Sequence, residues 1–421
     1  MRIPSERYTS PAFAALEYER LWPKTWLVAC SSDHVVDVGD WFEFRCGTLS
    51  VVIVRNDDGV LRAFQNVCRH RGNALCAGAG AGLTELRCRY HRWTWDLDGR
   101  LREVPSRKAF GTLRNDDFGL FPVRVGEWGR LVFVNLDPDA VSLDEYLEGI
   151  PADAAWAKLD DFRCAAMTTT PVACNWKVVN EGFSETYHVQ GLHREMLPSM
   201  DDIHSPQRLW GLHGASYQPY GVASPRLGGG ASDREVWESF VVTQGGRMGP
   251  DCAENRSEMP APPPVRDGET MQDAIARRIR EYQASIGVDL SAFGTRELTH
   301  LWQYNLFPNA TLLINADLYA VLTSRPGPSL GEAELVIVYF TRATSSTATR
   351  STPINVTLAP EAGNHGYVFD QDVSILAGMQ RGLSQPGLDA ITLSAEECRI
   401  VNMHRNLERY LGLAPGGRID A

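Results

Sequence analysis

The sequence predicts an α+β fold in which a small all-β unit precedes a larger region of mixed strands and helices. Between residues 40 and 137, short apolar runs alternate with tight-turn sequences, which is typical of β hairpins. Beyond residue 156, strand-like runs are interspersed with amphipathic helical segments. The 421 residues, of which 43% are hydrophobic and 22% charged, suffice for two or three folded domains.

The elements of the first part follow from apolar spacing and turn residues. Residues 10–26 have the spacing of a helix, and the β-rich texture starts after them. Asn56-Asp57-Asp58-Gly59 separates two β-branched or apolar runs, which predicts a hairpin. The predicted strands of this part are 51–54, 60–64, 93–95, 100–101 and, within 126–136, 131–134.

The second part mixes both element types. Residues 270–286 have apolar residues on one helical face, which predicts an amphipathic helix. Residues 223–266 are rich in Gly, Pro and Ser and predict a long loop, a mobile cover over a site. The other predicted elements are helices at 143–147, 176–187 and 372–383, strands at 166–172 and 333–341, and a strand pair within 301–323 around Pro308-Asn309.

Charge and cysteine usage limit the class of protein. A net charge of -11 and a pI near 5.5 leave no basic stripe for nucleic acid. The start MRIPSERYTS lacks an apolar signal segment, and no apolar run approaches 18 residues, so we expect a cytoplasmic protein with no membrane partner. Nine scattered cysteines indicate metal ligands and buried thiols, among them Cys76, rather than disulfides.

One constellation of four residues carries the strongest chemical signal. Cys68 and His70 form a C-x-H pair, and Cys88 and His91 form a C-x-x-H pair, both within the β-rich unit. Two such loops facing each other offer two thiolates and two imidazoles, which suits a [2Fe-2S] cluster with Cys68 and Cys88 on one iron and His70 and His91 on the other. Structural zinc is the alternative, although zinc fingers usually separate cysteines from histidines.

A second constellation lies in the later part. Glu185 and His188 are three residues apart, so a helix would place them on one face, and His193 reaches the same point only if that helix ends near Gly191. Two imidazoles and a carboxylate form the facial triad of non-haem Fe(II) oxygenases. Glu185 and Asp372 both compete for the third place, and Asp372 would begin a helix whose positive end keeps it ionised. Taken alone, the two histidines are also consistent with buried core residues whose ring nitrogens have hydrogen-bond partners.

The chain resembles the α subunits of Rieske non-haem iron ring-hydroxylating oxygenases over essentially its whole length. The resemblance rests on the cluster motif, on Asn175-Trp176-Lys177, on the run from Glu185 to His193, and on an Asp eight residues before Gln380. It implies that His188, His193 and Asp372 bind mononuclear iron, with Asp370 as the fallback ligand. It also implies that Glu185 is the bridge that carries electrons from the cluster of one subunit to the iron of its neighbour in a trimer.

The resemblance also implies a domain plan. Residues 39–155 form the Rieske domain, residues 156–421 form a helix-grip catalytic domain with an antiparallel sheet around a deep pocket, and residues 1–38 pack on the catalytic domain. Glutamate at 185, where many members have aspartate, makes the chain similar to the branch that includes choline, glycine betaine and carnitine monooxygenases. Arg92 departs from the family, which often has Gly after the last cluster histidine.

The expected function is that of a terminal oxygenase that takes electrons from a reductase or ferredoxin and uses O₂ to hydroxylate, dihydroxylate or dealkylate a small, mainly apolar or aromatic substrate. The alternatives are a quaternary ammonium monooxygenase, a Rieske electron carrier, a non-catalytic ligand-binding protein with a helix-grip pocket, and a zinc-stabilised protein. A homotrimer is expected, with or without a β subunit. Expected pocket-wall residues are Phe183, Leu192, Met196, Leu197, Trp210, Trp302, Leu306, Phe307, Leu312, Ile314 and Phe369.

Overall fold

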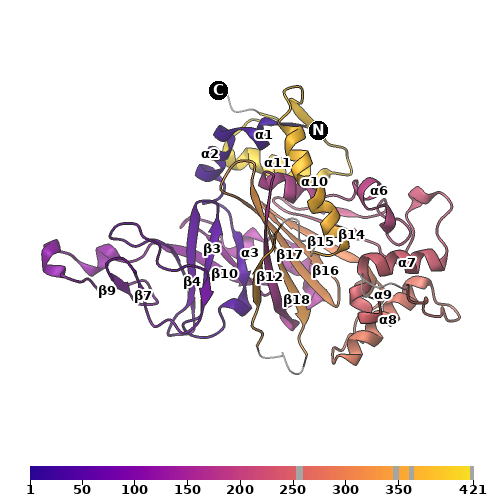
Figure 1. The fold of residues 1–421 in the computed structure, drawn as a ribbon, viewed down its shortest axis with the longest axis horizontal. Coiled ribbons are helices and arrows are strands. Elements are labelled where there is room, and N and C mark those ends of the chain that lie inside the picture. The colour runs from indigo at the N-terminus through magenta and orange to yellow at the C-terminus, as the bar shows by residue number, and fades with distance from the viewer. Residues whose placement is uncertain (253–258, 345–349, 360–364, 418–421) are drawn as a thin grey trace. The chain divides into compact units, whose positions relative to one another are not determined.

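The computed structural model describes residues 1–252, 259–344, 350–359 and 365–417, and the chain forms two compact units (Figure 1). One unit is Glu17–Tyr146, and the other joins Met1–Leu16 to Leu147–Ala421. The first is built from β-sheets and the second from a large sheet with helices, so the predicted α+β class is confirmed. Among the described residues, no helix combines the length and the apolar character needed to cross a membrane.

The β-rich unit is organised around a seven-stranded antiparallel sheet. Its strand order is β2-β11-β10-β5-β4-β3-β6, and a small sheet β7-β8-β9 accompanies it. Glycine turns produce the hairpins: Gly59 has φ 75° between β4 and β5. The strand predicted at 131–134 is confirmed as β11, and β10 pairs with it across the turn at Gly129-Arg130. The strands are β2 Leu27–Ser31, β3 Trp41–Cys46, β4 Leu49–Arg55, β5 Leu61–Gln65, β6 Ala79–Gly80, β7 Leu86–Arg87, β8 Thr94–Trp95, β9 Leu101–Glu103, β10 Pro122–Trp128 and β11 Leu131–Asn135.

The larger unit contains an eight-stranded sheet in the order β13-β14-β15-β16-β17-β18-β12-β19. Every neighbouring pair is antiparallel except β12 with β19. The predicted pair around Pro308-Asn309 is β15 and β16, and β17 follows as a third strand. The strands are β12 Phe162–Val172, β13 Gln207–Leu209, β14 Gly214–Gln218, β15 Leu301–Leu306, β16 Ala310–Ile314, β17 Leu318–Pro326, β18 Ala333–Arg342 and β19 Ile354–Thr357.

Helices of this unit lie in two groups in Figure 1. Helix α5 (Trp176–Gly182) packs on β17 and β18, and α10 (Tyr367–Leu383) packs on α5 and β12. Helix α11 (Cys398–Leu411) packs on β14. In the second group, α8 (Met271–Ser285) contacts α7 (Asp233–Gln244) and α9 (Thr295–Thr299).

The predicted loop at 223–266 is wrong for residues 233–252. Ser232 and Glu235 form a capping box that starts α7, and the helix buries Trp237, Phe240 and Val241. Two 3-10 turns follow, Gly245–Met248 and Pro250–Cys252, while residues 253–258 lie outside the described part. The capping box and the apolar spacing after it were present in the sequence, but the surrounding Gly and Pro residues masked them.

The unit boundaries fall at 16/17 and 146/147, whereas the sequence predicts domains that begin at 39 and 156. The N-terminal difference arises because β2 pairs with β11 in the sheet of the β-rich unit. The helix predicted at 10–26 is shorter, α2 Pro11–Arg20, and a turn containing Pro23 follows it. The preceding α1 (Glu6–Thr9) and β1 (Arg2–Pro4) belong to the larger unit, where β1 pairs with β20 (Ala390–Thr392).

Candidate active site and metal centres

Two turns of matching shape carry the four predicted cluster ligands. Cys68 lies three residues after β5, and Cys88 directly follows β7. In the first turn the Gly72 amide donates to the Cys68 carbonyl at 3.0 Å, and in the second the Arg92 amide donates to the Cys88 carbonyl at 3.0 Å. The same four-residue spacing therefore closes both turns, which explains why each presents a cysteine and a histidine from one tight loop.

The four side chains fit a two-iron cluster better than one zinc ion. Cys68 and Cys88 are buried, and burial together with the neighbouring Cys88 thiol raises the pKa of Cys68. The rings of His70 and His91 lie 4.6 Å apart between centroids, and the buried Nδ1 of His70 has no hydrogen-bond partner among the described residues. No three of these residues converge on one point in the described part of the chain, as ligands of a single zinc would.

Arg92 stands where the family often has glycine, and its backbone has a conformation that usually favours glycine. Its φ is 60°, close to the φ of 78° at Gly72 in the matching turn. A left-handed backbone favours glycine, because a Cβ costs about 1–2 kcal/mol there. Arg92 is exposed, so its side chain meets solvent and the turn tolerates the strain.

The second site is built around a chain reversal rather than one long helix. Helix α5 ends at Gly182, and the hydroxyl of Ser184 donates to the Asn180 carbonyl. The single-turn helix α6 (Val189–Leu192) follows, with His188 at its N-cap and His193 at its C-cap. The prediction that Glu185 and His188 share one helix ending near Gly191 is therefore wrong. The histidines converge because they flank a turn of only four residues.

His188, His193 and Asp372 form the one group of three metal-ligating side chains found among the described residues, with ligand atoms within 4.8 Å of one another. His193 Nε2 lies 2.9 Å and His188 Nε2 3.7 Å from the same atom, Asp372 Oδ1. The facial arrangement of two imidazoles and a carboxylate is the donor set of mononuclear Fe(II). The structure thus brings together the three residues that the sequence singled out.

Both histidines are held through their other ring nitrogen. His188 Nδ1 contacts Glu185 Oε1, and His193 Nδ1 lies 2.5 Å from Gln371 Oε1. These acceptors favour the Nδ1–H tautomer and leave each Nε2 lone pair for a metal. Burial lowers the pKa of His188, but Glu185 and Asp372 outweigh it and the net shift is upward. Nothing in the sequence pointed to Gln371 except its place beside Asp372.

Asp372 occupies the second turn of α10, so the prediction that it begins a helix is wrong. The helix begins at Tyr367, because Gly366 with φ 107° lets the chain enter it, and the first-turn acid is Asp370. Asp370 Oδ1 accepts a hydrogen bond from the His365 amide at 3.1 Å. This bond engages Asp370, the fallback ligand, outside the triad. Asp372 is therefore not at the helix end, and its place beside the histidines comes from its face on α10.

Gln380 has a structural role on the same helix. Its Oε1 accepts the Asn175 amide at 2.8 Å. Asn175 in turn caps α5, since its side chain accepts the Lys177 amide at 3.1 Å. This hydrogen bond holds α10 against the start of α5. It also gives a structural role to Asn175 and Gln380, two of the residues on which the family resemblance rests.

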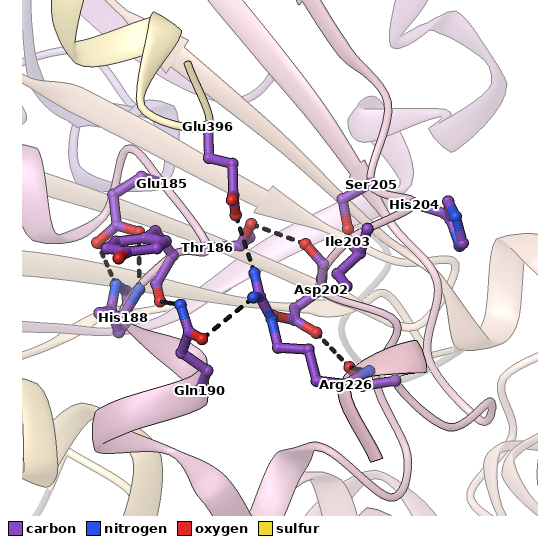
Figure 2. Close-up of polar contacts among 12 residues, drawn as sticks. Glu185, Thr186, His188, Gln190, Asp202, Ile203, His204, Ser205, Arg226 and Glu396 are labelled. Atoms are coloured by element: carbon purple, nitrogen blue, oxygen red, sulfur yellow. Dashed lines mark hydrogen bonds and ion pairs between the residues drawn. The ribbon is translucent and has the colours of Figure 1, made fainter. Parts of the chain in front are cut away.

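A network around Arg226 supports the segment that carries Glu185 and His188 (Figure 2). Arg226 donates to Asp202 at 2.6 Å, to Gln190 at 3.1 Å and to Glu396 at 2.9 Å. The side chain of Asp202 is fully buried, so its charge requires this partner. Because Gln190 lies in α6, the guanidinium ties the histidine-bearing turn to two distant segments of the chain.

A cavity of about 400 Å³ adjoins the triad, and His188, His193, Asp372 and Glu185 all line it. Of the eleven predicted wall residues, three line it: Phe183, Met196 and Phe369. Several of the others lie on strands whose alternate residues face the cavity. Leu313 lines it while Leu312 and Ile314 do not, and Gln303 lines it while Trp302 does not.

The cavity wall is more polar than the sequence suggested. Gln218, Gln283 and Gln303 line it, and so does the buried ion pair of Arg247 and Asp317. The aromatic residues that line it are Phe183, Tyr220, Phe340, Tyr367 and Phe369. The cavity therefore offers apolar and aromatic surface together with a small number of oriented polar groups, as ligand sites do.

Known proteins share both halves of this architecture. Residues 25–118 match the Rieske [2Fe-2S] domain, and residues 155–413 match the ring hydroxylating alpha subunit (catalytic domain). The carnitine monooxygenase oxygenase subunit of Escherichia coli (strain K12) is 34% identical over 226 residues, which are 53% of this chain and 59% of that protein. The glycine betaine monooxygenase oxygenase subunit of Chromohalobacter salexigens is 33% identical over 213 residues, 49% of this chain and 46% of that protein.

The alignments span about half the length of the curated relatives. A solved quaternary ammonium Rieske monooxygenase has a TM-score of 0.69 at 19% identity, covering 97% of this chain and 95% of that one. Naphthalene 1,2-dioxygenase from Rhodococcus sp. has a TM-score of 0.64 at 18% identity, covering 97% and 94%. These likenesses concern the fold, and the domain matches give the lineage and its [2Fe-2S] and mononuclear iron centres: the chain belongs to the family of ring-hydroxylating alpha subunits, with a Rieske [2Fe-2S] domain ahead of its catalytic domain.

Proposed function

We propose that this chain is the terminal oxygenase subunit of a multicomponent enzyme that oxidises a small organic molecule. The observation that carries the proposal is the cavity of about 400 Å³ whose wall includes the complete set of His188, His193 and Asp372. A cavity of this volume holds a small molecule beside the metal ligands. A pure electron carrier has no use for such a cavity, and a non-catalytic binding protein has no use for the cluster loops.

The proposed ligand roles follow the donor chemistry. Cys68, Cys88, His70 and His91 hold the cluster, and His188, His193 and Asp372 hold the iron. When bound, the two groups supply one-electron transfer and the activation of O₂ at a ferrous ion. The chain itself orients both imidazoles through Glu185 and Gln371, keeps Asp372 in the second turn of a rigid helix, and surrounds the substrate with apolar side chains.

Glu185 is the proposed electron bridge. It contacts the proposed ligand His188 through both oxygens: Oε1 with the ring Nδ1, and Oε2 with the backbone amide at 3.0 Å. Its side chain keeps about a tenth of its surface exposed, so it can meet a group of a neighbouring subunit. The proposed partner group is a cluster histidine of a second copy, and the proposed assembly is a homotrimer, with or without a β subunit.

The proposed electron donor is a reductase or ferredoxin, and the proposed location is the cytoplasm. The proposed cluster domain of residues 39–155 is extended at its start by β2, which pairs with β11 in the same sheet. Residues 156–421 are the proposed catalytic domain, and of the first 38 residues only 1–16 belong with it. A partner protein supplies electrons because the cluster only relays them.

A quaternary ammonium substrate is the favoured class, ahead of an apolar or aromatic one. Five aromatic residues line the cavity, and aromatic faces attract an alkylammonium cation that has lost its water. The relatives named above are monooxygenase subunits for carnitine and glycine betaine. On this basis we propose a monooxygenation, with dihydroxylation of an aromatic ring as the second candidate because the same wall accepts a flat ring.

Metal analysis and oxygen uptake test the proposal. Protein loaded anaerobically with iron and sulfide should hold about three iron atoms per chain, show the visible absorption of a Rieske cluster and consume O₂ with a generic reductase and a suitable substrate. The panel contains quaternary amines, amides and aromatics. Two iron atoms per chain without O₂ uptake would support the electron carrier, and bound zinc without colour would support the structural protein.

A further inference from the structure

Arg247 lies in the cavity wall and is held there by fixed partners. It belongs to the 3-10 turn Gly245–Met248, between α7 and the rest of the helical group. Its Nε donates to Asp317 Oδ2 at 3.0 Å, and its Nη2 contacts Asp317 Oδ1 and the Leu298 carbonyl. The Asp317 side chain is 1% exposed and the Arg247 side chain 8%. The residual exposed surface of this ion pair therefore belongs mostly to the arginine.

The remaining guanidinium nitrogen has no acceptor. Within the described parts of the chain, no hydrogen-bond partner exists for Arg247 Nη1, and this nitrogen is not among the buried polar atoms. Arg247 lines the cavity, and Nη1 is the guanidinium nitrogen that its contacts with Asp317 and Leu298 leave free. The carboxylate of Asp317 occupies one edge of the guanidinium, so the plane of the arginine cannot turn away.

A second polar group reaches the same wall from α8. Gln283 is 9% exposed and lines the cavity, and none of the side-chain hydrogen bonds among the described residues involves its carboxamide. An amide supplies both donors and an acceptor. An almost completely buried arginine and an almost completely buried glutamine thus both lack protein partners on the side of the cavity.

Tyr220 connects this end electrostatically to the metal site. Burial raises the pKa of its hydroxyl, while Arg247 lowers it and Asp372 raises it. The Tyr220 hydroxyl therefore lies within electrostatic range of both the arginine and the metal-ligating aspartate. Since all three residues line one cavity of about 400 Å³, a single small molecule can contact both ends.

We propose that Arg247 Nη1, assisted by the Gln283 carboxamide, binds a carboxylate of the substrate and so orients its other end toward His188, His193 and Asp372. The inference rests on the proposed function and names the substrate class: a small acid, with a carboxylated quaternary amine as the first choice. A carboxylate should bind here better than a neutral acceptor. A hydrogen bond between the charged guanidinium and a charged carboxylate is shorter than a neutral hydrogen bond and about twice as strong. The aromatic residues of the wall then face the rest of the molecule.

Four probes in two matched pairs test the carboxylate site. Glycine betaine and choline share a trimethylammonium group, and benzoate and benzyl alcohol share a ring; within each pair a carboxylate replaces an alcohol. Calorimetric dissociation constants are measured on the full-length, iron-loaded, oxidised protein, so that no turnover is needed. At least one carboxylate should bind about tenfold or more tightly than its alcohol.

Variants assign that preference to Arg247. Arg247→Gln combined with Asp317→Asn removes both charges of the buried pair, which avoids leaving an unpaired carboxylate. The carboxylate-to-alcohol affinity ratio should fall to within about threefold of one, and Arg247→Lys should give an intermediate ratio. The matched control is Arg277→Gln with Glu269→Gln, an ion pair on and near α8 that does not line the cavity. It should leave the ratio unchanged.

Two kinds of result overturn the carboxylate site: equal or better binding of both alcohols, including the case in which neither carboxylate binds, and an unchanged ratio in the charge-free double variant. Failure of the oxygenase proposal looks different. In that case the ratio behaves as described, but the iron-loaded protein consumes no O₂ with any probe and an electron donor. With active protein, the double variant should raise KM for the carboxylate more than it lowers kcat.

Discussion

The Glu185 carboxylate forms two hydrogen bonds with His188, one with the imidazole Nδ1 and one with the backbone amide at 3.0 Å. This relationship orients the ring before any metal is present.

Replacing Glu185 by Gln should stop turnover and keep both metal centres. The amide keeps the shape and one acceptor, but it removes the charge of the proposed bridge. We expect steady-state O₂ uptake to fall about 100-fold or more, with iron content and the cluster spectrum unchanged. Glu238→Gln on the exposed face of α7 is the control. Turnover within about threefold of wild type would exclude the bridge role.

Replacing Gln371 by Leu should weaken iron binding at the mononuclear site. His193 loses the acceptor that holds its Nδ1–H, so the ring tautomer and orientation are no longer fixed. Outer-shell partners of this kind contribute about 10–100-fold to metal affinity. Iron retention against a chelator series measures the change. Gln385→Leu, just after the end of α10, is the control, because its side chain donates only to the Arg381 carbonyl.

Removing Arg226 should destabilise the catalytic unit by about 3 kcal/mol, since Asp202 would keep a buried charge without its partner. Arg226→Met tests this in urea unfolding of the larger unit. Adding Asp202→Asn should recover about half of the loss. If the single and double variants are equally stable, the ion pair does not support the segment around α6.

Arg92→Gly should stabilise the second cluster turn. Relief of the left-handed strain at φ 60° contributes about 1–2 kcal/mol, and the greater freedom of glycine in the unfolded chain offsets about 0.5–1 kcal/mol of it. We expect slower bleaching of the cluster on heating. Arg89→Gly in the same loop is the control, because Arg89 is exposed and is not among the positive-φ residues, so it should bleach at the same rate or faster.

His300 should make the protein sensitive to mild acid. Burial lowers its pKa to about 4, below the 6.5 of the free side chain. As the pH falls below 6.5 the unfolded chain takes up the proton first, so stability is full above pH 6.5 and is lost toward pH 4. The loss should be about 1–2 kcal/mol after allowance for solvent. Unfolding midpoints of His300→Gln should fall less over this range, whereas exposed His204→Gln should follow wild type.

The sequence predicted the donor sets well because metal ligation depends on residue type and spacing. Cys68, His70, Cys88 and His91 lie in tight turns, and local spacing determines which side chains a tight turn can present. It also predicted His188 and His193 as neighbours, although for the wrong reason: a short helix between them brings them together. The mistaken loop at 233–252 shows that a capping box outweighs a Gly-rich context.

The residues that line the cavity were the hardest part of the site to predict from the sequence. Leu312, Leu313 and Ile314 are all apolar, and only the register of β16 in the sheet decides that Leu313 faces the cavity. Arg247 gave no signal, because its partner Asp317 lies 70 residues away. Gln371 gave none either, since its contact with His193 crosses 178 residues.

By itself, the sequence determined the two kinds of metal donors, the α+β class and the lineage, because these depend on local spacing and on motifs that stay together along the chain. Only the tertiary structure decided that Asp372 joins the histidines from the second turn of α10, that Gln371 supports one of them, and that Arg247 lines the cavity while it pairs with Asp317. The physical reason is that such contacts join segments far apart in sequence, and their geometry is set by packing of helices on the sheet, which local propensity does not encode.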